Sequence, residues 1–184
     1  MEILNLHTPN SQGLTLVELL AGVAVIAIVF AIGIPGYRSL AGTSRVTTAI
    51  NSMAGYLHYA RSEAVTRGIP VVLCPSADGR NCDDTIDWQQ GYMVFVDTLR
   101  NRIPSPLHPP LRYARPPQKG VSIRTSVGRK KLVYYPSGMS PGSTATITVC
   151  DQSGVAEPRA IIVSNAGRPR LSRVKPDGKP LICG

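Results

Sequence analysis

Gly13-Leu14-Thr15-Leu16-Val17-Glu18 opens the stretch that decides the fold, because an apolar run continues from it to Ile34. The 21 residues of this run would span about 30 Å as a helix, which is the thickness of a bilayer's hydrocarbon core. Glu18 is the one charged residue among them, and a carboxylate there costs about 2 to 4 kcal/mol to insert into a membrane. The sequence therefore predicts a membrane-length helix with a functional carboxylate near its start.

The residues before the run form a short leader that ends in glycine. An ordinary secretory signal has its cleavage site after the apolar core, whereas the candidate site here precedes it. Gly13, Leu14, Thr15, Leu16 and Glu18 resemble the N-terminal signature of type IV pilins and type II secretion pseudopilins. In that signature prepilin peptidase cuts after a glycine, and glutamate is the fifth mature residue.

The resemblance implies a leader at residues 1–13, cleavage between Gly13 and Leu14, and methylation of the new amine. It also implies that Glu18 serves assembly by pairing with the N-terminal amine of a neighbouring subunit. The leader lacks the Lys or Arg usual in the family, and Leu14 stands where phenylalanine is usual. The alternative interpretation is an uncleaved membrane anchor that happens to carry one glutamate.

A second helical pattern follows the membrane segment at residues 14–34. Apolar residues recur at intervals of three and four from Val46 to Ala64, as on one face of a helix. Pro35 and Gly36 interrupt between the two halves, so we expect a kink or local melting there. Arg67-Gly68-Ile69-Pro70 supplies a glycine cap and a proline stop, which predicts that the amphipathic helix covers residues 35–67.

Residues 68–184 form the predicted periplasmic domain, where the apolar period changes to two and turn residues multiply. Six prolines within residues 103–117 favour a loop or an edge crossing over a central strand. The predicted strands cover residues 69–74, 91–97, 121–125, 131–135, 145–150 and 160–164. A long N-terminal helix on a small antiparallel sheet is an α+β arrangement, and it is also the type IV pilin fold that the resemblance implies.

Three later segments narrow the resemblance to the FimT/GspH group of minor pilins and pseudopilins. They are Trp88 to Asp97, then Tyr135-Pro136-Ser137-Gly138, and then Arg159 to Ser164 followed by Gly167-Arg168. We interpret Trp88, Val94 and Phe95 as core and turn residues rather than as a binding site.

The four cysteines suggest an oxidising compartment beyond the cytoplasmic membrane. Three pairings are possible, and we favour Cys74 with Cys82 and Cys150 with Cys183 because the shorter loops close most readily. Zinc is the competing use, but no histidine lies near a cysteine in the sequence and neither spacing is C-x-x-C. The sequence thus predicts two disulfides, no metal site and no cofactor.

No catalytic pattern is present, so the sequence predicts a protein that is not an enzyme. The three histidines are far apart in the sequence and have no nucleophile motif near them. Asp83, Asp84 and Asp87 could hold calcium through carboxylate oxygens, but the EF-hand spacing is absent. A solvated acidic loop is the favoured interpretation.

Positive charge is concentrated in the second half of the chain. Residues 1–97 hold five Lys or Arg against eight Asp or Glu, whereas residues 98–184 hold fifteen against three, giving net charges of −3 and +12. A half that basic suggests an anionic partner, either nucleic acid or an acidic surface. The alternative is a protein that its charge merely keeps soluble.

Gly167-Arg168-Pro169-Arg170 is the most suggestive polar element. Residues two apart share a face in an extended chain, and guanidinium groups make forked hydrogen bonds to phosphate. FimT-like minor pilins of natural transformation carry a similar Gly-Arg-x-Arg element implicated in DNA binding, and the resemblance places it on these residues. The alternative is a solvated basic tail. The candidate DNA contacts are Arg168, Arg170, Arg173 and Lys175, with the run Arg129, Lys130 and Lys131.

Together these features predict a single-pass inner-membrane protein that joins a type IV pilus at or near its tip and binds DNA during uptake. Its expected partners are other pilins or pseudopilins, prepilin peptidase and DNA without sequence preference. The alternative is a GspH-type minor pseudopilin of a type II secretion system, which assembles a filament for protein export. A structural subunit that primes the pilus is a third interpretation.

Overall fold

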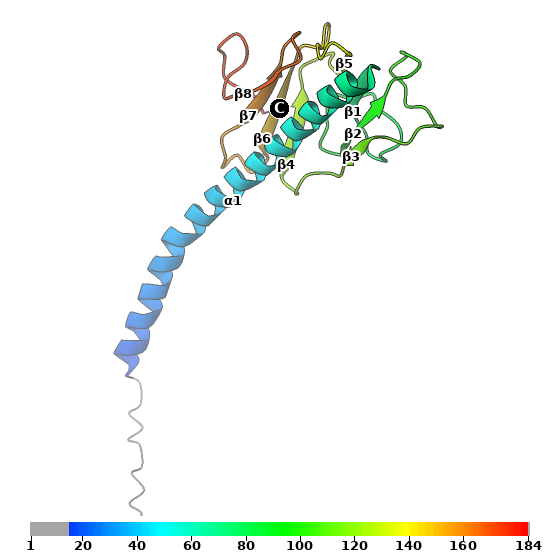
Figure 1. Cartoon of the computed structure of the whole chain (residues 1–184). Coiled ribbons are helices and arrows are strands. Elements are labelled where there is room, and N and C mark those ends of the chain that lie inside the picture. Colours follow the sequence, from blue (N-terminus) through cyan, green and yellow to red (C-terminus); the bar gives the residue numbers. More distant parts are fainter. Residues whose placement is uncertain (1–14, 184) are drawn as a thin grey trace, which may run out of the picture. The chain divides into compact units, whose positions relative to one another are not determined.

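The structure is a computed structural model that describes residues 15–183 (Figure 1). It divides into two compact units, one up to Arg38 and one from Ser39 onward. Gly13 and Leu14, the predicted processing site, lie outside the described residues. Helix α1 (Leu16–Arg67) contributes residues to both units.

The first unit consists of the N-terminal part of α1. Every residue from Leu16 to Ile34 is exposed. Since Glu18 is the one charged residue among them, this exposed surface is almost entirely apolar. Among the described residues, α1 is the helix long and apolar enough to cross a membrane. An exposed apolar surface of this length needs lipid or another protein around it.

The helix is continuous through Pro35 and Gly36, which corrects the expectation of local melting there. Proline lacks one N–H and therefore removes one helical hydrogen bond. The turns on either side keep their backbone hydrogen bonds, so the loss is local and the helix continues through Pro35.

The second part of α1 packs its predicted apolar face into the domain core. Buried residues recur along it at the expected spacing, namely Val46, Ala49, Ile50, Met53, Leu57, Ala60 and Ala64. The fold class is therefore confirmed as a long N-terminal helix on a small antiparallel domain.

Two four-stranded antiparallel sheets complete the second unit. The first has the order β3-β2-β1-β5, with β1 (Val71–Pro75), β2 (Tyr92–Val96), β3 (Arg112–Ala114) and β5 (Leu132–Tyr134). The second has the order β4-β6-β7-β8, with β4 (Val121–Thr125), β6 (Ala145–Asp151), β7 (Arg159–Val163) and β8 (Pro169–Ser172).

Two of these strands, β3 and β8, were not predicted as strands from the sequence. Strand β3 lies inside the proline-rich segment, and β8 begins at Pro169. Both are edge strands, where a residue that lacks a backbone N–H is tolerated because one side of the strand makes no ladder bonds. Residues 103–117, expected to be a loop or an edge crossing, form a loop that leads into and out of the edge strand β3.

The main core lies between α1 and the sheets and includes Trp88 and Val94. Phe95, the next residue of β2, is buried in a second, smaller cluster on the opposite face of the first sheet. All three residues are buried, as expected for core residues. Disulfides join Cys74 to Cys82 and Cys150 to Cys183, which is the favoured pairing.

Candidate functional site

The start of α1 is closed by a reciprocal pair of polar residues, Thr15 and Glu18. The backbone N–H and hydroxyl of Thr15 donate to Glu18 Oε2 at 3.0 and 2.9 Å, and the backbone N–H of Glu18 donates to Thr15 Oγ1 at 3.3 Å. This is a capping box, in which two side chains satisfy amides that the first helical turn leaves free. This second role of Glu18 was not predicted from the sequence, although the Thr-x-x-Glu spacing signals it.

Gly167, the first residue of the predicted DNA element, is buried and fixed in place by the β5–β6 connection. Its φ of +71° is left-handed, and its N–H donates to the carbonyl of Ser164 at 2.8 Å. A Cβ added to Gly167 would overlap the carbonyl oxygen of Gly138 and lie 3.2 Å from Tyr134 Cε1. That carbonyl also accepts a 2.9 Å hydrogen bond from Arg61 Nε, so it has little freedom to move.

The two arginines that follow are presented at the edge of the second sheet. Arg168 directly precedes β8, while Arg170 lies within it and pairs with Ile162 of β7. Both arginines are exposed, and within residues 15–183 neither forms an ion pair or a side-chain hydrogen bond. Strand alternation places Arg170 with Ile162 on the face of the sheet opposite the core.

The structure separates the remaining members of the basic segment. Arg173 borders a hollow together with Arg159, Leu171 and Ile50 of α1, so it lies toward the helix side of β8. Lys175 instead borders a hollow over the outer face of the second sheet. The four cations that the sequence grouped as one site therefore occupy more than one face.

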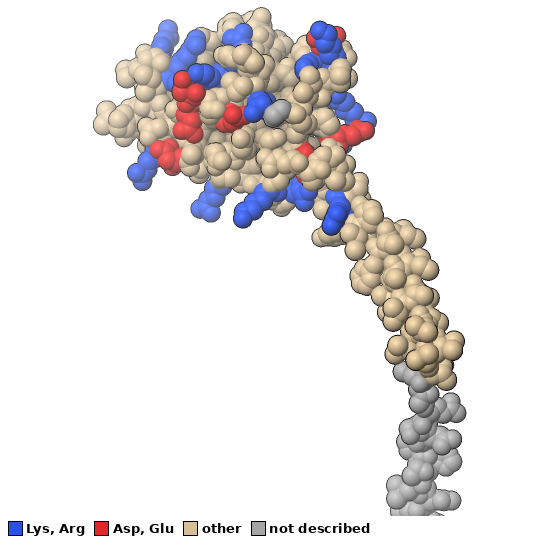
Figure 2. Space-filling view, turned by 180° about the vertical axis from the view of Figure 1, so that it is seen from behind, with Lys and Arg blue, Asp and Glu red and all other residues tan. Residues whose placement is uncertain are grey.

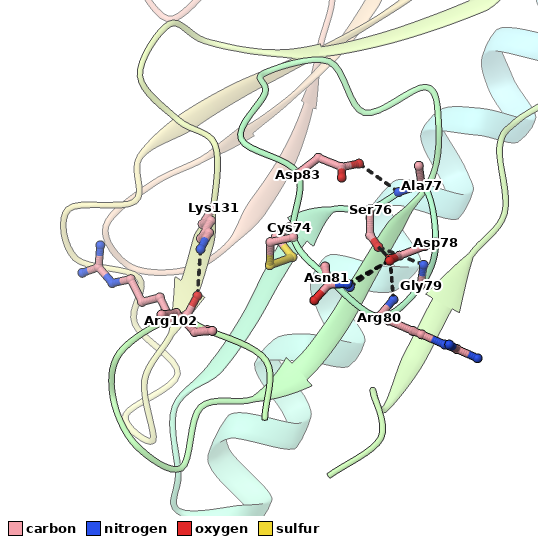
Figure 3. Close-up of a disulfide and its surroundings, with 12 residues drawn as sticks. Cys74, Ser76, Ala77, Asp78, Gly79, Arg80, Asn81, Asp83, Arg102 and Lys131 are labelled. Atoms are coloured by element: carbon pink, nitrogen blue, oxygen red, sulfur yellow. Dashed lines mark hydrogen bonds between the residues drawn. A yellow bond between two sulfur atoms is a disulfide. The ribbon is translucent and has the colours of Figure 1, made fainter. Parts of the chain in front are cut away.

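The run Arg129, Lys130 and Lys131 is occupied by contacts inside the chain. Arg129 Nη1 donates to the carbonyl of Gly142 at 2.6 Å, and Lys131 Nζ donates to the carbonyl of Arg102 at 2.8 Å (Figure 3). Lys130 Nζ lies 2.7 Å from a carboxylate oxygen of Asp84. These three side chains connect loops of the domain to one another. Each would have to share or release its present partner in order to contact DNA.

Basic side chains on the face drawn in Figure 2 lie around the outline of the globular unit rather than in one continuous patch. The acidic side chains lie among them, so the large net charge of the second half of the chain does not form a single basic patch on this face.

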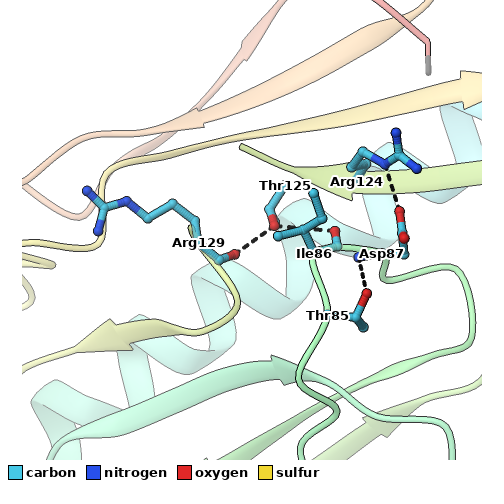
Figure 4. Close-up of polar contacts among 6 residues, drawn as sticks. All are labelled: Thr85, Ile86, Asp87, Arg124, Thr125 and Arg129. Carbon is cyan, nitrogen blue, oxygen red and sulfur yellow. Dashed lines mark hydrogen bonds and ion pairs between the residues drawn. The ribbon is translucent and has the colours of Figure 1, made fainter. Parts of the chain in front are cut away.

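The three aspartates considered for calcium point to three different partners. Asp83 accepts a hydrogen bond from the N–H of Ala77 at 2.9 Å (Figure 3), and Asp84 pairs with Lys130. Asp87 Oδ1 lies 2.7 Å from Arg124 Nε, while Arg129 points away from that pair (Figure 4). Across residues 15–183 there is no group of three potential metal ligands, so the calcium alternative is not supported.

Asp78 stabilises the turn enclosed by the first disulfide. Its Oδ1 accepts hydrogen bonds from the N–H groups of Arg80 and Asn81 at 2.7 and 2.9 Å (Figure 3). These backbone bonds hold the pKa of the Asp78 carboxyl well below its ordinary value. The acidic residues of this region therefore have structural roles.

A hollow of about 600 Å³ lies over the outer face of the second sheet. Thr146 and Thr148 of β6 form part of its lining, with Arg124, Lys175 and Ile182 around them. Both cysteines at its border are joined in a disulfide, so neither offers a free thiol to the hollow.

Comparison with known proteins gives two family matches. The family described as type II transport protein GspH matches residues 49–167. The family described as prokaryotic N-terminal methylation motif matches residues 8–34. No curated protein matches the chain.

Solved structures of one minor pilin show the same fold. Two crystal forms of the Pseudomonas aeruginosa type IV minor pilin FimU are 21% and 22% identical, with TM-scores of 0.55 and 0.54. They cover 75% and 73% of this chain, which corresponds to 93% and 96% of theirs. The minor pseudopilin EpsH of Vibrio cholerae is 13% identical with a TM-score of 0.49, over 70% of this chain and 96% of its own.

Proposed function

We propose that this chain, which belongs to the family of the type II transport protein GspH, joins a type IV pilus at or near the tip and binds DNA there during uptake in natural transformation. The coarser assignment, a type IV minor pilin or pseudopilin, follows from the family, the N-terminal motif and the fold together. Such proteins are structural subunits rather than enzymes, and they assemble with other pilins in filaments.

The exposed apolar part of α1 is the observation that carries the filament assignment. Its side chains from Leu16 to Ile34 have no core of their own to enter, and water would disfavour so large an apolar surface. The inner membrane would hold this segment first, and neighbouring helices would hold it in the filament. Prepilin peptidase would remove residues 1–13 between these two states, by cutting between Gly13 and Leu14.

Glu18 would contribute both to the helix start and to assembly. Its Oε2 is used by Thr15, and the carboxylate charge would pair with the N-terminal amine of a neighbouring subunit. Such a pair offsets the cost of placing a charge in an apolar filament core. The two roles separate in Glu18→Gln, because glutamine can complete a capping box but carries no charge.

DNA contact is assigned to Arg168 and Arg170 because both side chains are exposed and have no partner within the described chain. The buried Gly167 directly before them fixes the position of the backbone from which they extend. Their guanidinium groups would contact phosphates without reading base sequence. Lys175 lies over the same outer face as Arg170 and would add a contact to the same DNA, whereas Arg173 lies toward the helix side and would reach only DNA that wraps around the sheet edge. The engaged Arg129 to Lys131 run would contribute least.

A pseudopilin of a type II secretion system remains the second candidate. It is favoured by the description of the matched family and by the basic residues being spread over several faces. In that case the basic surface would meet protein rather than DNA.

A binding titration with a soluble form, residues 38–184, tests the DNA assignment at two salt concentrations. Each phosphate contact on duplex DNA adds about 0.9 to the slope of log affinity against log salt, so losing two contacts lowers the slope by about 1.8. Arg168→Gln with Arg170→Gln should show this loss on unrelated sequences. A control that changes exposed Arg115 and Lys119 to Gln removes the same charge and should retain the slope. The DNA proposal would be falsified if binding were absent at low salt or fell equally in both double variants.

A further inference from the structure

The loop from Asp97 to Leu111, which joins β2 to β3, is held in a defined shape by its own polar contacts. Both oxygens of the Asp97 carboxylate accept from the N–H of Arg102 at 3.1 Å, and Oδ1 also accepts from the N–H of Asn101 at 3.0 Å. Asp97 is only 3% exposed, so this carboxylate is committed to the loop. The loop stands at the margin of the globular unit and is drawn in green (Figure 1).

The backbone of this loop adopts conformations that its residues disfavour. Arg100 and Arg102 have φ values of 55° and 58°, and they are the non-glycine residues with positive φ in the described chain. A side chain with a Cβ is disfavoured in this left-handed region, so the surrounding contacts must hold it there. Lys131 adds to those contacts through the carbonyl of Arg102 (Figure 3). Strain of this kind is typical of binding and functional loops.

The strained loop exposes three aliphatic side chains to solvent. Leu99, Ile103 and Leu107 are 73%, 60% and 86% exposed. Single exposed leucines are ordinary, but three in one ordered loop that does not fold back on the core indicate a contact surface.

Three arginines lie in or beside the loop. Arg80, Arg100 and Arg102 are exposed, and Arg80 borders a hollow of about 430 Å³ together with the proline segment Pro104–Pro110. The carboxylates of Asp97 and Asp78 accept hydrogen bonds from backbone amides rather than from these arginines. A partner surface with carboxylates of its own would complement the three guanidinium groups.

We propose that the β2–β3 loop docks onto an acidic, partly apolar surface of a different subunit in the same filament. This inference rests on the proposed filament function. A protein surface fits better than DNA, because a phosphate backbone would satisfy the arginines but would leave Leu99, Ile103 and Leu107 in water. The docking surface is also separate from Arg168 and Arg170, which lie at the edge of the other sheet.

A photocrosslinking amino acid in place of Leu107, in the full-length protein in cells that assemble filaments, tests this docking. Illumination should join it to an acidic surface of another filament subunit, identified by mass spectrometry of sheared filaments. The matched control places the same amino acid at Val127, which is 91% exposed and lies in the β4–β5 connection.

The dependence of the crosslink yield on the loop arginines provides a second test. Arg100→Asn with Arg102→Asn should lower the crosslink yield roughly tenfold, because two interfacial charges are lost while asparagine tolerates the left-handed backbone. Arg115→Gln with Lys119→Gln should leave the yield unchanged. Equal yields at positions 107 and 127, or a crosslink to DNA or to a second copy of this chain, would overturn the docking proposal although the chain is present in filaments. Absence of the chain from filaments would instead overturn the proposed function.

Discussion

Replacing Gly167 by alanine should destabilise the globular unit more than its backbone conformation alone explains. An L-residue at φ +71° costs about 1 to 2 kcal/mol relative to glycine. The added Cβ would also overlap the carbonyl oxygen of Gly138, and moving that carbonyl disturbs its 2.9 Å bond from Arg61. Overpacking of this kind costs about 1 to 3 kcal/mol, so we expect a total loss of about 2 to 5 kcal/mol.

Thermal unfolding of the soluble form, residues 38–184, followed by circular dichroism, measures this loss. For a domain of this size 1 kcal/mol lowers the midpoint by about 3 °C, so Gly167→Ala should lower it by roughly 6 to 15 °C. Gly154 is a matched control, because it has the same φ of +71° and nothing within 4 Å of an added Cβ. Gly154→Ala should cost only the backbone strain, about 3 to 6 °C. Equal shifts in the two variants would refute the steric argument.

Three further outcomes are expected. Changing Cys150 and Cys183 to Ser should lower the free energy of unfolding by about 4 kcal/mol, whereas changing Cys74 and Cys82 to Ser should lower it by about 2.5 kcal/mol. The first pair is separated by 33 residues and the second by 8, so the first disulfide closes the larger loop. A denaturant titration that ranks the two losses in the opposite order would contradict this. Asp151 is 4% exposed, and hydrogen bonds from Ser153 and Arg45 hold its pKa below the ordinary value, so its contribution should be complete above the unfolded pKa of about 4 and lost as pH falls through the lower folded pKa. Unfolding measured from pH 7 to pH 2 should therefore be flatter on the acid side in Asp151→Asn, which should also be about 1 to 3 kcal/mol less stable at pH 7. Glu18→Gln should insert into membranes normally but be missing from sheared filaments probed with antibody, and normal incorporation would remove the assembly role of its charge.

The sequence predicted the parts of the fold that depend on local patterns. The apolar run to Ile34 and the three-and-four spacing from Val46 to Ala64 correspond to the exposed and the packed parts of α1. Period-two alternation placed six strands to within a few residues. Strands β3 and β8 were missed because prolines lie beside β3 and at the start of β8. An edge strand of this kind depends on its one neighbouring strand, which is set by the fold.

The candidate site was predictable only in outline. The Gly-Arg-x-Arg element was identified from the sequence, yet the burial of Gly167 against Gly138 depends on two connections brought together by the sheets. The expectation that Lys130 and Lys131 are available for DNA did not anticipate their contacts with Asp84 and Arg102, because those residues are far away in the sequence.

The sequence by itself thus determined a membrane-length helix with one carboxylate, an amphipathic continuation, paired cysteines and a strongly basic second half. These features follow from periodicity, spacing and composition, which depend only on residues close together in the sequence. Only the tertiary structure decided which cations stay free. Arg170 in β8 faces away from the core, whereas Arg173, just after β8, lies toward the helix side. Contacts between distant segments, such as Asp84 with Lys130, decide which charges are already paired.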